Sequence, residues 1–175
     1  MAPEDLGKSL QAQPLLSALK RHGVDFVVIG GVAGLAQGSS YPTYDLDVAY
    51  GRDPANVGRL VDALAEIGVT LRGAPPDLPF QLDAQTLGNG ANFTFATEFG
   101  SFDVLADVAG IKSYDALRAA STLKRIAGVE VRVASLDDLI SMKRAANRVK
   151  DQLMVVEYVE LAEELRRREA EDADA

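Results

Sequence analysis

Hydrophobic and polar positions follow two different periods along the chain. Apolar residues recur at helical spacing in some segments, whereas shorter segments rich in β-branched and aromatic residues are typical of strands. Helices are predicted over residues 9–22, 32–38, 54–67, 113–120 and from 135 to about 168, with a break near Arg148. Strands are predicted over residues 24–29, 44–50, 91–97, 101–105, 123–126 and 129–133.

Local start and stop signals support several of these boundaries. Asp53 followed by Pro54 is typical of a helix start, and Gly68 of a helix end. Ser135 is followed three residues later by an acid, which is the spacing of a capping box. The acidic residues 169–175 are expected to be frayed.

The order of these elements predicts an α/β or α+β fold, in which helices flank a small mixed β-sheet. A helical C-terminal region follows. We expect residues 1–134 to form the core and residues 135–175 to form a helical extension, with both packed into a single compact unit. The start of the chain lacks a basic segment followed by a long apolar run, so the expected location is the cytoplasm, with no membrane association.

Composition narrows the chemistry that the chain can perform. Its 175 residues contain no cysteine and one histidine, His22, which excludes thiol catalysis, thiolate zinc sites and a two-histidine metal site within the chain. His22 itself is best interpreted as the C-terminal residue of the first helix. The net charge of −8 argues against a generally basic nucleic-acid surface, although a local basic patch is still possible. Carboxylate chemistry with a hard metal ion is left.

Asp45 and Asp47 lie two residues apart on a predicted strand, so their side chains point to the same face. Two carboxylates on one face repel each other unless a cation lies between them, and Mg²⁺ prefers such oxygen ligands. Upstream, Gly30 and Gly31 occupy a predicted strand-to-helix turn, where glycine allows close backbone approach and a helix start can bind phosphate.

Two other phosphate motifs do not fit. A dinucleotide-binding fingerprint that ends at Gly34 would need glycine at position 29, which is Ile29. Gly7, Lys8 and Ser9 resemble the end of a P-loop, but the earlier glycine and the preceding strand are both missing.

The segment VVIGGVAGLAQGSSYPTYDLDVAY resembles the opening motif of the polymerase-β-like nucleotidyltransferase superfamily. Thr43, two residues before the first aspartate, resembles the bacterial toxin-type and abortive-infection branch of that superfamily. The later segment SLDDLISMKRAANRVKD also looks like the C-terminal motif of those proteins. The resemblance spans roughly residues 24–155. It departs from the family pattern at Tyr41, where members usually carry an arginine.

The resemblance implies a nucleotidyltransferase fold and a third catalytic acid on a later strand. Asp103 matches that position, and strand alternation favours it over Asp107, which falls after the strand. Asp45, Asp47 and Asp103 would then be the catalytic and metal-binding residues, with two Mg²⁺ ions. Asp103 would also help to deprotonate the attacking hydroxyl. A salt-bridged strand acid is the structural alternative for Asp103.

Basic residues concentrate late in an otherwise acidic chain. Arg144, Arg148 and Asp151 would share one face of a continuous helix, with Lys143 facing a neighbouring direction. The resemblance implies that Lys143 or Arg148 contacts the nucleoside triphosphate, beside Gly30, Gly31 and Thr43. The alternative is a solvated helix face with a weak Arg148–Asp151 ion pair.

Three functions stay open on the sequence. The first is transfer of a nucleotide from an NTP to a hydroxyl on RNA, such as the 3′ end of tRNA, by a toxin with a cognate antitoxin as partner. The second is a non-catalytic nucleotidyltransferase-like binding protein, which Tyr41 leaves possible. The third is transfer to a small molecule such as an aminoglycoside, because an acidic surface suits a cationic substrate. Asn89, Asn92 and Thr94 are further candidates for contacts with a base or sugar.

Overall fold

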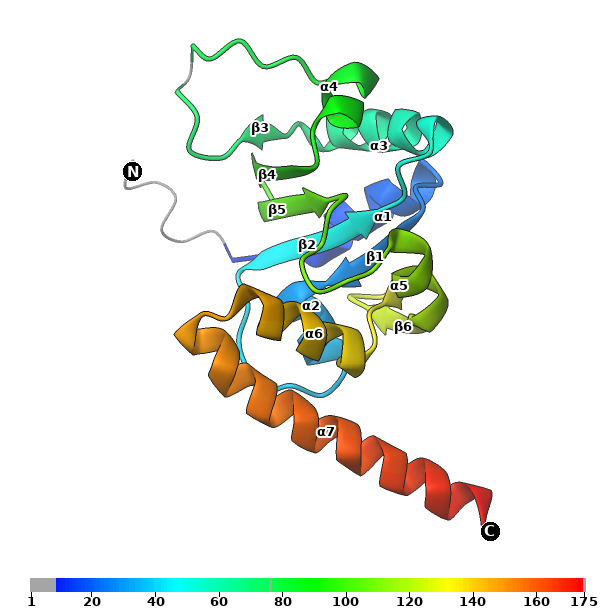
Figure 1. The fold of residues 1–175 in the computed structure, drawn as a ribbon. Coiled ribbons are helices and arrows are strands. Elements are labelled where there is room, and N and C mark those ends of the chain that lie inside the picture. Colours follow the sequence, from blue (N-terminus) through cyan, green and yellow to red (C-terminus); the bar gives the residue numbers. More distant parts are fainter. Residues whose placement is uncertain (1–8, 76, 175) are drawn as a thin grey trace.

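The computed structural model describes residues 9–75 and 77–174 (Figure 1). One mixed sheet forms its centre, in the order β3-β4-β5-β2-β1-β7-β6. Its strands are β1 (Phe26–Ile29), β2 (Asp45–Tyr50), β3 (Thr70–Leu71), β4 (Asn92–Thr97), β5 (Gly100–Leu105), β6 (Thr122–Ile126) and β7 (Val129–Val133). Pairs β2–β5 and β1–β7 are parallel, and the other neighbouring strands are antiparallel. The prediction of a mixed sheet with flanking helices is confirmed.

Helices cover the sheet and extend beyond it. They are α1 (Ala12–Arg21), α2 (Gly30–Ala36), α3 (Pro54–Ile67), α4 (Ala84–Asn89), α5 (Tyr114–Ala120), α6 (Leu136–Ala146) and α7 (Val149–Ala173). Leucines at helical spacing in α1 and α3 are buried with the apolar residues of β2 and β5 in one core. Figure 1 shows α7 running past α6 and away from the sheet.

Several predicted helix boundaries are present as capped ends. The Asp53 side chain accepts a hydrogen bond from the Asn56 N–H, and Gly68 ends α3 with a left-handed φ of 73°. The Ser135 hydroxyl accepts a hydrogen bond from the Asp138 N–H. These residues stop and start helices because each supplies a partner or a conformation that the helix end lacks.

The C-terminal region differs from the prediction at its end. The break between α6 and α7 lies at Asn147, whose left-handed φ of 49° stops α6 one residue before Arg148. The expectation that residues 169–175 are frayed is wrong as far as Ala173, because α7 continues to that residue. The short elements β3 and α4 were not predicted, because neither is long enough to show a period.

The last helix, α7, packs directly on α2. A Cβ atom at Gly34 of α2 would lie 2.2 Å from the hydroxyl of Tyr158 in α7. Tyr158 is fully buried, so a glycine is needed for this close approach. The division at residue 134 stays a prediction. Among the described residues, no helix is long and apolar enough to cross a membrane.

Candidate active site

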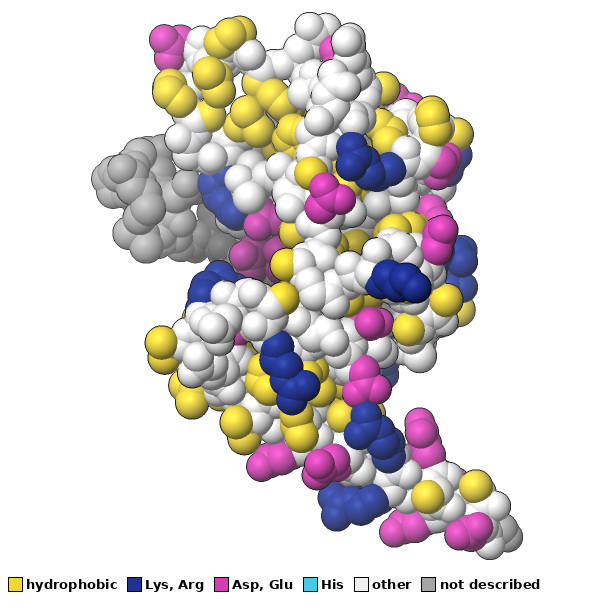
Figure 2. All heavy atoms as spheres, in the orientation of Figure 1, with side chains coloured by type: hydrophobic (Ala, Val, Ile, Leu, Met, Phe, Trp, Pro, Cys, Tyr) yellow, Lys and Arg dark blue, Asp and Glu magenta, His cyan; other side chains and the backbone are white. Residues whose placement is uncertain are grey.

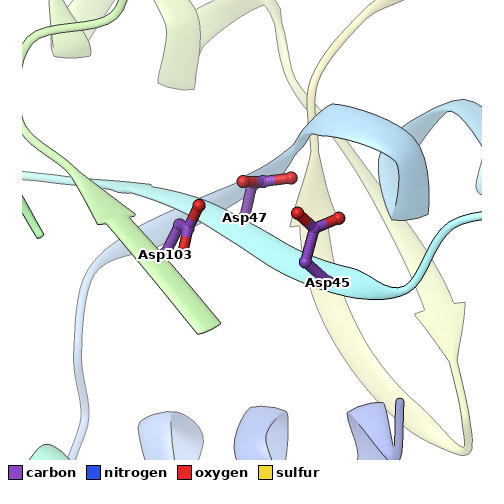
Figure 3. Close-up of side chains that lie close together, drawn as sticks. All are labelled: Asp45, Asp47 and Asp103. Carbon is purple, nitrogen blue, oxygen red and sulfur yellow. The ribbon is translucent and has the colours of Figure 1, made fainter. Parts of the chain in front are cut away.

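Two parallel strands bring the three predicted acids together. Asp47 of β2 is paired in register with Asp103 of β5, and Asp45 lies two residues earlier on the same face of β2. One carboxylate oxygen from each residue lies within 4.8 Å of the other two. Figure 3 shows the three side chains pointing into one space from β2 and β5. Leu46, between the two acids of β2, points to the opposite face and is fully buried.

The three carboxylates carry like charges and lie close together, and burial with this repulsion raises the pKa of two of them. Burial, together with the charges of Asp45 and Asp103, raises the pKa of Asp47 to about 7. Burial also raises the pKa of Asp103, against the opposing effect of Arg72. Like charges that are held together out of water disfavour ionisation, and a bound cation relieves that penalty. Lys143 and Arg72 act in the opposite direction, but they do not offset the rise in the pKa of Asp47.

The donor set fits a hard divalent cation. Oxygen atoms of carboxylates are the ligands that Mg²⁺ and similar ions prefer. The Arg72 Nη2 donates a hydrogen bond to Asp103 Oδ2 at 3.1 Å. Asp103 Oδ1 is buried and, among the described residues, receives no hydrogen bond. Arg72 Nη2 also lies 3.0 Å from this oxygen, so the contact there is a charge pairing, and Oδ1 keeps lone pairs for a metal ion.

The glycine turn makes room for this cluster. Gly30 has a φ of 66°, and a Cβ atom there would lie 2.2 Å from Asp47 Oδ2. A Cβ atom at Gly31 would lie 2.6 Å from the hydroxyl oxygen of Thr43. Thr43 in turn lies 3.2 Å from both the backbone oxygen and the Oδ1 of Asp45 and donates to them. Gly30 therefore makes room for Asp47 and Gly31 for Thr43, and the predicted contact of both glycines with phosphate stays a prediction.

The predicted basic residues lie across the same cleft from the acids. The cleft has a volume of about 400 Å³. Its lining residues are Gly30, Gly31, Pro42, Thr43, Asp45, Asp47, Asp103, Lys143, Arg148, Lys150, Asp151 and Met154. All eight predicted site residues are among them. Their roles in catalysis and in nucleotide binding stay predictions.

Asp151 holds the two predicted triphosphate contacts in place. Its side chain is 1% exposed, and it accepts hydrogen bonds from Lys143 Nζ at 3.0 Å and Arg148 Nε at 2.7 Å. Burial acts to raise the pKa of Asp151, but the hydrogen bonds from Arg148 and Lys143 outweigh it and hold the pKa at about 2. A shared face with Arg144 would need a continuous helix. The helix breaks at Asn147, close to the predicted break, and Arg144 lines a different depression.

The remaining candidates have structural positions. Asp107 lies outside the cluster with its side chain 71% exposed, beside Arg52, so Asp103 is the acid that joins the cluster. His22 caps α1 and contacts Glu66 at 2.6 Å. The Asn92 side chain binds the backbone of residues 106 and 107. Thr94 is paired in register with Asp103 and is exposed.

Sequence reasoning missed two residues that contact the cleft's surroundings: one bonds to Asp103, and the other to the loop before Thr43. Arg72 comes directly after the short strand β3 and contacts Asp103, although nothing in its own neighbourhood signals a site. Glu157 of α7 accepts hydrogen bonds from the hydroxyl of Ser39 at 2.9 Å and from the N–H of Ser40 at 2.7 Å. It ties the loop that leads to Thr43 onto α7.

No family model matches the chain, and no curated protein does. Solved structures resemble it in fold. The lincosamide antibiotic adenylyltransferase LnuA, bound to lincomycin, has a TM-score of 0.57 and 11% identity over 87% of this chain and 99% of its own. The fold is of the nucleotidyltransferase type. The antibiotic-resistance factor ANT(2″)-Ia has a TM-score of 0.52 and 17% identity over 93% of each chain. A Thermotoga maritima protein described as a nucleotidyltransferase has a TM-score of 0.50 and 17% identity over 91% of each chain.

The fold gives the acid cluster its context. The likeness covers nearly the whole chain, and the chain combines this nucleotidyltransferase-type fold with a cluster of three aspartates. At these identities the likeness concerns the fold alone. The toxin and abortive-infection branch that the motifs resemble stays a prediction.

Proposed function

We propose that the chain is a metal-dependent nucleotidyltransferase that moves a nucleoside monophosphate from an NTP to a hydroxyl group. The observation that carries this proposal is the convergence of three aspartates on one side of a cleft that also contains Lys143 and Arg148. Carboxylates alone would repel a triphosphate, and basic residues alone would not bind the metal that phosphoryl transfer uses. The cleft holds both kinds of charge.

Asp45, Asp47 and Asp103 are the residues that would hold the metal, which we propose to be two Mg²⁺ ions. When bound, such ions polarise the attacking hydroxyl and stabilise the charge on the departing pyrophosphate. The acceptor oxygen bonds to the α-phosphorus, and the bond from that phosphorus to the α,β-bridging oxygen breaks. Its electron pair leaves on pyrophosphate, while the hydroxyl proton passes to a carboxylate, for which we propose Asp103.

Lys143 and Arg148 are the proposed contacts for the triphosphate. Both are held by the buried carboxylate of Asp151, so their cationic groups are positioned before a nucleotide arrives. Gly30, Gly31 and Thr43 line the same cleft and would lie against the nucleotide. Because NTPs are cytoplasmic metabolites, this proposal places the chain in the cytoplasm.

For the acceptor, the resemblance of the motifs favours RNA, in particular the 3′ end of tRNA, with the chain as a toxin and a cognate antitoxin as its partner. A small molecule is the second candidate. The net charge of −8 suits a cationic acceptor, and two of the solved structures of similar fold are described as antibiotic adenylyltransferase or antibiotic-resistance factor. A non-catalytic binding role is the third, since Tyr41 replaces the arginine expected from the family pattern.

Incubation with Mg²⁺ and each labelled NTP tests the proposal. Total RNA, cell protein and an aminoglycoside are offered as separate acceptors. We expect label on one acceptor class, and loss of that label in the double variant Asp45→Asn plus Asp47→Asn. Asp107→Asn is the matched control, because it removes an exposed carboxylate outside the cluster. No transfer by the wild type, or unchanged transfer by the double variant, would refute the enzyme and favour the binding role.

A further inference from the structure

Arg72 lies at the edge of the acid cluster that is remote from the glycine turn. It follows β3 directly, and its N–H donates to the backbone oxygen of Thr94 at 3.0 Å, which anchors it beside β4. Its Nη2 lies 3.0 Å from Asp103 Oδ1 and 3.1 Å from Asp103 Oδ2. The Arg72 side chain is 29% exposed and that of Asp103 is 15% exposed. The guanidinium therefore lies beside Asp103 and is partly open to solvent, so a ligand can reach it.

Positive charge thus flanks the acids on two sides. Arg72 follows β3, so it lies on the side of the acids where β4 and β3 continue the sheet beyond β5. Three other basic residues, Lys143, Arg148 and Lys150, line the cleft from α6 and the start of α7. Figure 2 shows blue Lys and Arg atoms both above and below a magenta acidic patch at this level of the molecule. If the triphosphate lies on the α6–α7 side, the acceptor must approach from the side of Asp103 and Arg72.

Arg72 has donors to spare. Only its Nη2 bonds to Asp103, and none of the other guanidinium N–H groups donates to another residue within 9–75 or 77–174. An arginine has five N–H donors in a planar fork that matches a phosphate group. The ion pair with Asp103 holds this fork in a fixed direction, so little side-chain freedom remains to be lost when a ligand binds.

We propose that Arg72 binds a phosphate group of the acceptor and thereby selects an RNA end, on which a phosphodiester lies close to the reacting hydroxyl. A cationic acceptor such as an aminoglycoside would meet a like charge at this position, which disfavours it. This inference rests on the proposed function, because it takes Asp103 as the acid on the acceptor side. It concerns a specificity residue that the motifs did not include.

The first experiment measures binding without turnover. A fluorescein-labelled RNA hexanucleotide is titrated with protein in Mg²⁺ and without any NTP, and its anisotropy is recorded at several salt concentrations. We expect Arg72→Ala to weaken binding about tenfold, the scale of one lost charge-assisted contact. The slope of log affinity against log salt should also become shallower by about 0.7, the value for one single-strand phosphate contact. Arg72→Lys, which keeps the charge and loses the fork, should lie in between.

The matched control is Arg167→Ala, which removes an equal charge from the exposed end of α7, far along the chain from the cleft residues. It should leave binding and the salt slope unchanged. Circular dichroism of each variant shows whether it is folded. Wild-type protein that does not bind the RNA, or Arg72→Ala protein that binds as tightly as wild type, overturns the inference.

The second experiment compares two acceptors in the transfer reaction. One is a dinucleotide ending in adenosine, which has a phosphate beside the terminal nucleoside, and the other is adenosine alone. We expect wild type to prefer the dinucleotide, and Arg72→Ala to lose this preference through a higher KM. Efficient labelling of kanamycin by wild type, undiminished in Arg72→Ala, overturns the inference and leaves the proposed function intact. If wild type labels nothing, the proposed function fails, and the binding experiment alone decides on Arg72.

Discussion

The cleft contains two acidic centres, the aspartate cluster and Asp151, whose pKa values are shifted in opposite directions. In the cluster of Asp45, Asp47 and Asp103, burial and mutual repulsion raise the pKa of Asp47 to about 7. Asp151 lines the same cleft and its side chain is more deeply buried, yet Arg148 and Lys143 hold its pKa at about 2. Burial acts in the same direction on both. The difference comes from the partners that the fold supplies.

This contrast distinguishes Asp151, whose charge is used up by partners within the chain, from the aspartate cluster, whose charge is available to a ligand. Asp151 is satisfied within the chain, so its role is to fix Lys143 and Arg148. The cluster is only partly satisfied: Arg72 pairs with Asp103, but Asp103 Oδ1 has no hydrogen bond within the described part of the chain. Buried acids that are left unbalanced cost stability, and such sites are typical of function. Substitutions at the two centres should therefore affect stability in opposite directions.

The largest expected effect is on activity at the cluster. Asp47→Asn should lower nucleotide transfer by about 10³-fold, the scale on which removal of one active-site electrostatic contact acts. The same change should raise the melting temperature of metal-free protein at pH 8, because it removes a repelled charge. Initial rates and thermal melts check both. A variant that is inactive and also less stable would contradict the claim that repulsion among the three carboxylates destabilises the metal-free protein.

The next effect is on stability at the other centre. Asp151→Asn should lower the free energy of unfolding at pH 7 by about 3 kcal/mol, because it leaves two cations around a buried neutral group. Urea unfolding measures this, with Asp137→Asn as the control, since Asp137 forms an exposed ion pair with Arg166. The stability from Asp151 is present above its ordinary pKa and is lost as pH falls towards 2. A loss no larger than that of the control would show that the pair is not important for stability.

The third effect is a pH-dependent response to metal. Because the pKa of Asp47 is about 7 in the folded chain against 3.8 ordinarily, its ionisation destabilises metal-free protein progressively between those values. A metal ion must displace the proton below pH 7, so Mg²⁺ or Mn²⁺ should bind roughly tenfold more weakly at pH 6 than at pH 8. Isothermal titration calorimetry at both pH values checks this. Equal affinity at pH 6 and pH 8 would contradict the raised pKa.

The smallest effect is expected at the loop that connects the two centres. Glu157→Gln keeps the shape of the side chain but weakens its hydrogen bonds to Ser39 and Ser40. The free energy of unfolding should fall by about 1 kcal/mol, as for one ordinary hydrogen bond. If the loop positions Thr43, the KM for the NTP should rise more than kcat falls. Glu160→Gln, on an exposed part of the same helix, is the control.

How much of this could be predicted depends on how local each cause is. The alternation of β2 and β5 places the three aspartates on one face, and a period of two is visible in the residues themselves. The caps at Asp53 and Ser135 are equally local. The contact of Arg72 with Asp103 spans 31 residues and depends on how β3 and β4 pair, which short-range patterns do not determine. The contact of Lys143 with Asp151 depends on one left-handed residue, Asn147, that turns the two helices.

The tight packing at Gly30 and Gly31 affects how homologues with a damaged site would be recognised from sequence. A side chain at Gly30 would overlap Asp47, and one at Gly31 would overlap Thr43. A descendant could therefore keep every aspartate, lysine and arginine of the cleft and still lose the space that Asp47 and Thr43 occupy, through one added methyl group. Genome surveys that score only charged residues would count that descendant's site as intact. The glycine pair is the more sensitive marker, because it has no chemistry of its own to be retained for another purpose.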